Sequence, residues 1–330
     1  MACKLAAWRI THTNSSPRFR CDGIAPSLRR GVRCLILVAI LTAGCDRYGG
    51  SQDGVIDVFG GVGLGPGAFS YPRAITVEPG GGVFVVDKAG RIQRFSRDGA
   101  YETEWRMPGT DLGKPVGIAV HPDGRIFVAD THYSRVMIFD RDGKQLGSFG
   151  SEGNGDGEFQ LTTDVAFDAE GFIYVSEYHL NDRITKWSPA LEFAGAIGDD
   201  LVAGERLRRP AGMEIDDEQT LWVADACNHR IVRFSLDGEV ISTIGRFGRG
   251  AGELRYPFDV DVTPEGEILV CEYGGDRLQW FSKDGRTLRI WGRSGRNAGE
   301  LSGPWGAACG PRGRVYVVDS LNSRVQIVEP

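Results

Sequence analysis

The sequence has no apolar run long enough to cross a bilayer as a helix. Its longest run, CLILVAIL at residues 34–41, is much shorter than the roughly 20 residues that a spanning helix needs. Helical periodicity is absent beyond Gly50, and neither a glycine-rich phosphate loop nor a serine–histidine–aspartate order stands out. We therefore expect strands and turns after Gly50, and no motif points to nucleotide binding or serine-based hydrolysis.

Cysteine is too sparse and too unevenly placed for a disulfide framework. Three of the seven cysteines lie within residues 1–44, and a fourth is Cys45. The remaining three, Cys227, Cys271 and Cys309, are an odd number spread over a long stretch. We expect single buried thiols there, and the sequence leaves open whether two of them pair.

Clustered positive charge is also missing from most of the chain. Residues 1–44 hold seven of the 38 basic residues and one of the 44 acidic residues, which leaves 31 against 43 and a net charge of −12 for the rest. Proteins bind phosphate backbones through clustered Lys and Arg, so we expect no nucleic acid partner. The arginines at 246–255 and 293–296 are expected to be solvated loop charges.

Glycine, by contrast, is abundant at 47 of 330 residues, and it accompanies a repeated unit. The stretch VADACNHRIVRF at 223–234 has five counterparts, among them VADTHYSRVMIF at 128–139 and VVDSLNSRVQIV at 317–328. Each copy places an acid shortly before an arginine, and successive acids are 43 to 48 residues apart. These acids are Asp87, Asp130, Glu177, Asp225, Glu272 and Asp319. A period of this length indicates a repeat architecture.

Each unit except the last contains four short apolar stretches separated by turns. The stretches alternate between apolar and polar residues, which is typical of antiparallel hairpins. Turns separate them, among them HPDG and the D-G pairs at 98, 142, 237 and 284. Four strands in each of six units predict an all-β, six-bladed β-propeller over residues 54–330. The last unit lacks a fourth strand, and DGVIDVFG at 53–60 matches the missing one. We predict that this N-terminal strand completes the last blade.

These units resemble the NHL repeat, whose Asn-His-Leu signature is echoed by CNHRI at 227–231. The resemblance covers about residues 54–330 and implies a propeller. It departs at Thr162, where the other units have proline, and in the loops before Arg91 and Arg183. Peptidyl-hydroxyglycine lyases are similar in blade design but place zinc-binding histidines at the position after the repeated proline, where this sequence has none. Gluconolactonase-type and streptogramin-lyase-like propellers are further alternatives that no motif here selects.

The first 44 residues resemble an export signal. Arginines at 29, 30 and 33 precede the apolar run, and LTAGC at 41–45 resembles the bacterial lipobox, in which the cysteine is lipidated. The resemblance implies a leader at 1–44, a lipid anchor on Cys45, a short tether at 45–53 and an envelope location on a bacterial membrane. Thr42 departs from the commoner leucine. The leader is long, and a later translation start, for instance at Leu28 or Val32, is an alternative.

The two faces of the predicted propeller differ in sequence. Turns between the first and second strands and between the third and fourth are nearly uniform, whereas the loops that lead into the innermost strands vary. Variable loops on rigid strands carry recognition, so we expect binding on the face where the innermost strands begin. The position after the repeated proline on that face holds Arg73, Phe258 and Trp305, which we predict to contact a ligand at the channel mouth.

Two other sets of side chains have the chemistry of metal ligands. His132 and His179 lie two positions after their repeat acids, but equivalent points on neighbouring blades are on the order of 10 Å apart, which favours ordinary loop histidines over a zinc site. The second set lies on the innermost strands, where pairing or channel water is favoured and a calcium-like site is the alternative. Its members are Asp164, Glu214, Asp259 and Asp261. We expect no cofactor.

The repeated acid and arginine are predicted to be structural, because they recur in every unit while other side chains change. The clearest pairs are Asp130 with Arg135, Asp225 with Arg230, and Asp319 with Arg324. The sequence as a whole favours a monomeric, membrane-anchored recognition module that binds a protein, a peptide or a small ligand in the cell envelope. A metal-assisted lyase or hydrolase at the channel mouth is the alternative, although no catalytic pair outside the repeat supports it.

Overall fold

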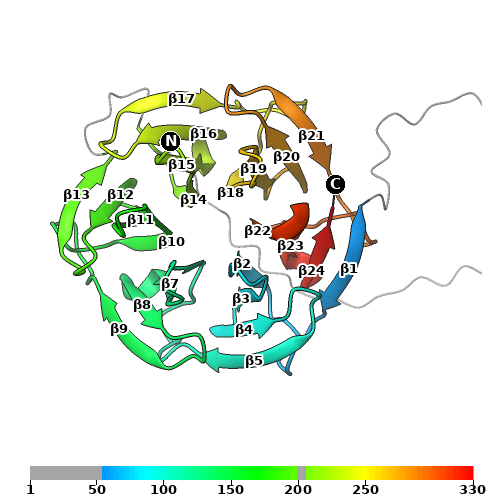
Figure 1. Cartoon of the computed structure of the whole chain (residues 1–330), viewed down its shortest axis with the longest axis horizontal. Coiled ribbons are helices and arrows are strands. Elements are labelled where there is room, and N and C mark those ends of the chain that lie inside the picture. The colour runs from blue at the N-terminus through cyan, green and yellow to red at the C-terminus, as the bar shows by residue number, and fades with distance from the viewer. Residues whose placement is uncertain (1–53, 199–205, 330) are drawn as a thin grey trace, which may run out of the picture. The chain divides into compact units, whose positions relative to one another are not determined.

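The computed structural model describes residues 54–198 and 206–329, which form six four-stranded antiparallel sheets around a central axis (Figure 1). The six-bladed propeller predicted from the repeats is therefore confirmed. The proposed leader at 1–44, Cys45 and the tether at 45–53 lie outside the described residues. Within the described ranges, no helix has the length and apolar character that a membrane crossing requires.

The first three blades follow one another along the chain. The first contains β2 (Pro72–Val77), β3 (Val83–Asp87), β4 (Arg91–Phe95) and β5 (Tyr101–Arg106). The second contains β6 (Gly117–Val120), β7 (Ile126–Asp130), β8 (Arg135–Phe139) and β9 (Gln145–Phe149), with the 3-10 turn η1 (Thr131–Tyr133) after β7. The third contains β10 (Leu161–Phe167), β11 (Ile173–Tyr178), β12 (Arg183–Trp187) and β13 (Phe193–Ile197).

The last three blades repeat the same order from the innermost to the outermost strand. The fourth contains β14 (Pro210–Ile215), β15 (Thr220–Asp225), β16 (Arg230–Ser235) and β17 (Val240–Ile244), with η2 (Ala226–Asn228). The fifth contains β18 (Pro257–Val262), β19 (Ile268–Glu272), β20 (Arg277–Phe281) and β21 (Thr287–Trp291). The sixth contains β22 (Gly306–Cys309), β23 (Val315–Asp319) and β24 (Arg324–Val328), with η3 (Pro311–Gly313) and η4 (Ser320–Asn322).

The ring is closed by the first strand of the chain. β1 (Val55–Gly60) pairs antiparallel with β24 and supplies the outermost strand of the sixth blade, as the sequence predicted. Phe59 packs on Phe69 and Phe95 of the first blade, with ring centroids 6.4 and 4.7 Å away. β1 therefore joins the two ends of the propeller through both backbone pairing and side-chain packing.

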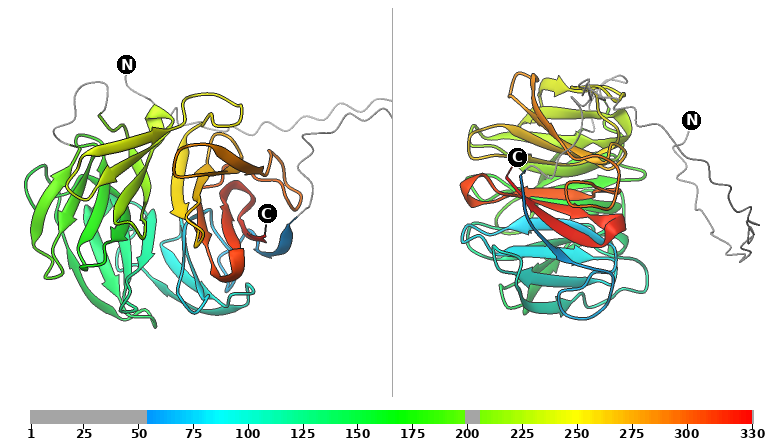
Figure 2. Two further views of the ribbon diagram at one scale, coloured as in Figure 1. Left: turned by 45° about the horizontal axis from the view of Figure 1, so that its top comes forward. Right: turned by 90° about the vertical axis from the view of Figure 1, so that its right-hand side faces the viewer.

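The core lies between adjacent blades rather than in one central mass. One cluster joins the first and sixth blades through Val85, Phe95, Tyr316 and Val318, all essentially inaccessible to water. Five similar clusters fill the other interfaces, and Figure 2 shows the blades facing one another around the ring. Each sheet thus buries both faces, which explains the nearly continuous apolar runs of the second strands.

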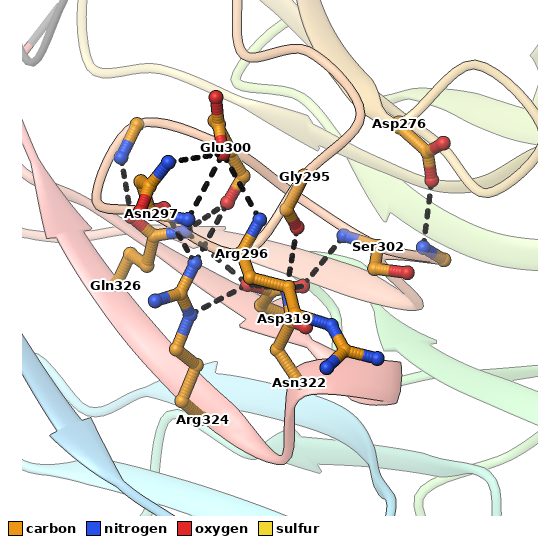
Figure 3. Close-up of polar contacts among 12 residues, drawn as sticks. Asp276, Gly295, Arg296, Asn297, Glu300, Ser302, Asp319, Asn322, Arg324 and Gln326 are labelled. Atoms are coloured by element: carbon orange, nitrogen blue, oxygen red, sulfur yellow. Dashed lines mark hydrogen bonds and ion pairs between the residues drawn. The ribbon is translucent and has the colours of Figure 1, made fainter. Parts of the chain in front are cut away.

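The repeat acids and arginines form buried ion pairs at the entry loops. The acids of all six blades are fully buried, and the donor–acceptor distance in the pairs is between 2.6 and 2.9 Å. In the sixth blade, Arg324 binds Asp319 and also donates to the carbonyls of Asn297 and Glu300, 2.7 and 2.9 Å away (Figure 3). Asp319 in turn accepts from the amide of Ser302 at 2.7 Å.

These ion pairs fix the loops that lead into the innermost strands. Four of the loops share one compact form, closed by an isolated bridge such as Val62 with Phe69 or Ser294 with Leu301. Gln93, Gln279 and Gln326 add a second clamp, because each donates to a loop carbonyl and accepts from a loop amide. The loops differ in sequence, yet a shared polar scaffold gives their face a defined shape.

Candidate ligand site in the central channel

The innermost strands enclose a cavity of about 460 Å³ along the propeller axis. All six blades contribute to its lining, which includes Arg73 and Trp305 at one end and Pro122 and Cys309 toward the other. A cavity of this size is within the range that holds small molecules or the end of a peptide. The channel along the ring axis is therefore a candidate binding site.

The three residues predicted for the channel mouth all line this cavity. Phe258 and Trp305 pack edge to face with ring centroids 5.0 Å apart, and the guanidinium of Arg73 lies 5.3 Å from the centroid of Trp305. Phe258 is buried, whereas Arg73 and Trp305 are partly exposed. The structure therefore brings together an arginine and two large aromatic rings from three different blades.

Four further residues complete the mouth and were missed by sequence reasoning. Tyr273 stacks on Phe258 with centroids 4.6 Å apart, and Tyr71 meets Trp305 at 5.8 Å. Arg209 lies over the rings of Tyr178 and Phe258, at 4.9 and 5.2 Å. We name the set of Tyr71, Arg73, Tyr178, Arg209, Phe258, Tyr273 and Trp305 the mouth cluster.

A positional signal for the missed residues was present in the repeats. Tyr71 and Arg209 directly precede the repeated proline, and both adopt positive φ angles of 55° and 59°. Tyr178 and Tyr273 directly follow the repeat acids. The zinc hypothesis concerned the position one residue further on, where His132 and His179 stand, and so Tyr178 and Tyr273 were not identified.

The two histidines lie apart from any metal-like arrangement. His132 is exposed and lines the cavity, whereas His179 is exposed and is absent from the cavity lining. Across residues 54–198 and 206–329, no three His, Cys, Asp or Glu side chains are grouped closely enough to hold a metal ion. His229 has a scaffold contact instead, since its Nδ1 accepts a hydrogen bond from the amide of Tyr256 at 3.0 Å.

The four channel acids lie deeper than the mouth cluster, and three of them bind backbone amides of the next blade. Asp164 accepts from the amide of Met213 at 2.9 Å, and Asp259 accepts from that of Ala307 at 2.9 Å. Asp261 accepts from the amide of Cys309 at 2.6 Å. Three of the acids thus link neighbouring innermost strands, which share no β-ladder.

Glycines on the neighbouring strands make room for two of these carboxylates. A Cβ at Gly212 would lie 2.0 Å from Oδ1 of Asp259, and a Cβ at Gly117 would lie 2.8 Å from Oδ1 of Asp164. Both separations are far below van der Waals contact, so alanine would not fit at either position without displacing the acid. The alternation of glycine and aspartate around the channel is therefore a packing requirement.

Burial gives the channel acids unusual proton affinities. Each of the four side chains is partly accessible, but the surrounding protein atoms penalise the charged forms of the carboxyls. Burial raises the pKa of Asp164 to about 7 and that of Asp261 to about 6. Burial and the neighbouring acids also raise the pKa values of Glu214 and Asp259 well above their ordinary range. The middle of the channel is therefore only partly ionised at neutral pH.

These pKa values predict that the channel acids oppose stability as the pH rises. A carboxyl whose pKa is higher in the folded state binds more protons when the protein is folded. The free energy of unfolding therefore falls as the pH rises from the unfolded pKa to the folded pKa. For Asp164 this interval runs from 3.8 to about 7. As the pH rises between these limits, we expect the melting temperature of Asp164→Asn to fall less than that of the wild type. The exposed Glu239→Gln is the control, and equal slopes for Asp164→Asn and the wild type would contradict the prediction.

Sequence comparisons identify the repeat directly. A family model described as a six-bladed β-propeller, DUF5128, matches residues 110–186, and the NHL repeat model matches residues 207–234 and 301–328. The chain therefore carries NHL repeats within a six-bladed β-propeller, as the sequence predicted. The protein brain tumor from Drosophila melanogaster is 28% identical over 133 residues, which are 40% of this chain and 12% of that protein. The chain thus matches only a small part of this much longer relative.

Structural comparisons show the same fold among enzymes. A streptogramin B lyase superposes with a TM-score of 0.59 at 17% identity, covering 82% of this chain and 96% of the lyase. A protein provisionally assigned as a gluconolactonase gives a TM-score of 0.62 at 16% identity, covering 84% and 94%. Virginiamycin B lyase from Staphylococcus aureus gives 0.55 at 15% identity, covering 78% and 80%. Identities this low establish the propeller fold alone.

Proposed function

We propose that this protein is a recognition module that binds a ligand in the mouth of its central channel. The observation that carries the proposal is the mouth cluster, in which Arg73 and Trp305 face a cavity of about 460 Å³. Aromatic and arginine side chains of this kind dominate the energetics of binding sites when they are partly desolvated and held in place. The buried ion pairs behind the entry loops hold this face without occupying the mouth.

Trp305→Ala is expected to abolish most of the binding while the propeller stays folded. Trp305 contacts four other members of the cluster, so its loss should weaken capture of the ligand from envelope extract by about tenfold or more. Capture is measured by mass spectrometry of co-purifying molecules, and folding by near-UV circular dichroism. Leu146→Ala, which removes an exposed side chain from the outer strand β9, is the matched control. Equal capture by Trp305→Ala and the wild type would refute the proposed site.

We further propose that the module is exported and anchored to a bacterial membrane through lipidated Cys45. The basic segment, the short apolar run and LTAGC support this location. Cys45→Ser is expected to move the protein from the membrane fraction to a soluble envelope fraction or to block its processing. Cys227→Ser, which leaves the leader intact, should fractionate like the wild type. Identical membrane association of Cys45→Ser and the wild type would remove the lipid anchor from the proposal.

A lyase or hydrolase is the second candidate, and one observation favours it. Asp164 has a pKa of about 7 and lines the cavity, so at neutral pH it could both donate and accept a proton. An enzyme of this kind should lose turnover in Asp164→Asn but retain ligand binding at the mouth. A pure recognition module should show no chemical change in a captured ligand. The two functions are separated by incubating a captured ligand with the wild type and with Asp164→Asn and analysing the products.

A further inference from the structure

The mouth cluster holds positive charge without a carboxylate partner. Arg73 and Arg209 make no ion pair with any described residue, whereas the repeat arginines all pair with buried acids. Lys88 lies at the same end, 6.0 Å from the ring centroid of Tyr71, and also has no ion pair within the described ranges. Each of these cations lies over an aromatic ring, which attracts a cation but does not neutralise it.

Arg73 is held in a setting that costs free energy in the unliganded protein. Its Nε is buried and has no hydrogen-bond partner among the described residues. Burial lowers the pKa of Arg73, and the nearby charge of Arg209 lowers it further, although Tyr71 and Tyr178 act in the opposite direction. A buried donor without an acceptor and two like charges without a counter-charge are both unfavourable. An anion between the two arginines would relieve both at once.

The deeper part of the channel has the opposite polarity. Asp164, Asp259 and Asp261 accept hydrogen bonds from backbone amides, and Glu214 adds a fourth carboxyl at the same level. An anionic group would be repelled there, whereas hydrogen-bond donors on a ligand would be accepted. The two ends of the cavity therefore fix the orientation of a bound molecule.

We propose that the ligand carries an oxyanion, a carboxylate or a phosphate, which binds between Arg73 and Arg209 beside a flat group that packs on Trp305 and Phe258. This inference rests on the proposed recognition function and names the chemical class that the mouth accepts. Guanidinium groups bind such oxyanions through paired hydrogen bonds, and the aromatic walls favour a ligand with a planar or apolar body next to the charge. Its remaining part extends toward the acids and carries hydrogen-bond donors.

Matched probes test the charge requirement. We expect N-acetyl-phenylalanine to bind the purified full-length protein at least about tenfold more tightly than N-acetyl-phenylalaninamide, which differs only in its terminal group. Phenyl phosphate distinguishes phosphate from carboxylate, and a peptide ending in phenylalanine, free or amidated, distinguishes a chain end from a small molecule. Binding is measured by isothermal titration calorimetry, with a short single-stranded RNA as competitor.

Variants assign the effect to the mouth. Arg73→Gln and Arg209→Gln should each remove the preference for the acid over the amide, whereas Arg296→Gln, an equal charge change on an exposed entry loop, should preserve it. Equal binding of acid and amide, with both weakened by Trp305→Ala, would overturn the oxyanion but leave recognition at the mouth intact. If no anionic probe shows saturable binding below about 10 mM, the oxyanion proposal is also overturned. Displacement by RNA would assign the mouth to nucleic acid instead.

Discussion

Deletion of Val55–Gly60 is expected to lower the melting temperature by about 10 °C or more and to promote self-association. The deletion removes the ladder with β24 and the contacts of Phe59, for which we expect a loss of about 4 kcal/mol. It also exposes β24 as an unpaired edge, which favours intermolecular pairing. Calorimetry and size-exclusion chromatography measure the two effects.

The control for this deletion removes six residues from the segment 45–53 and leaves β1 in place. That variant should unfold at the same temperature as the wild type, because the strand that closes the sixth blade remains. An unchanged melting temperature after loss of β1 would mean that the ring does not depend on the N-terminal strand. β1 would then not be needed to close the propeller.

Asp319→Ala is expected to destabilise the protein by about 3–5 kcal/mol, because it leaves the guanidinium of Arg324 without its buried counter-charge. The same change removes the acceptor for the amide of Ser302 and so loosens the entry loop of the sixth blade. Denaturant unfolding measures the free energy, and hydrogen exchange across residues 295–303 measures the loosening.

An exposed ion pair in the same loop provides the matched control. Arg293 binds Glu300 at 3.0 Å with about half of its side chain exposed, and Arg293→Ala should cost less than about 1 kcal/mol. Comparable losses in the two variants would contradict the view that burial, rather than charge pairing itself, makes the repeat acids important. The exchange data should likewise change only in Asp319→Ala.

The fold was predictable because the same pattern of strands and turns recurs in six units of the sequence. Repeated acids, D-G turns and alternating apolar strands each recur at one period, so an error in any single unit would not alter the architecture. Closure was also predictable, since the sixth unit lacks a strand that residues 53–60 supply. Both features depend on local sequence patterns, which can be recognised without knowing the contacts between blades.

The site was predictable only in part, because its contacts join residues that are distant in the chain. Arg73, Phe258 and Trp305 share one repeat position, and that position could be read from the alignment of units. The partners of Asp164 and Asp259 could not, because each carboxylate binds a backbone amide 48 or 49 residues later, on the next blade. Tyr178 and Tyr273 were missed for a related reason, because the direction of their side chains depends on how each loop leaves its strand.

The mouth and the deeper channel act on different properties of a ligand. Arg73 and Arg209 supply charge beside aromatic walls, whereas the channel acids change their ionisation near neutral pH. Affinity should therefore depend on salt through the mouth and on pH through the channel. The entry loops hold both parts in place through buried pairs such as Asp319 with Arg324.

A crystal structure of the protein with a ligand captured from envelope extract would show whether recognition occurs at the mouth cluster. We expect ligand density between Arg73 and Arg209, with the body of the molecule against Trp305 and Phe258. Density on the opposite face or on the outer strands, with the channel mouth free of ligand, would contradict recognition at the mouth cluster.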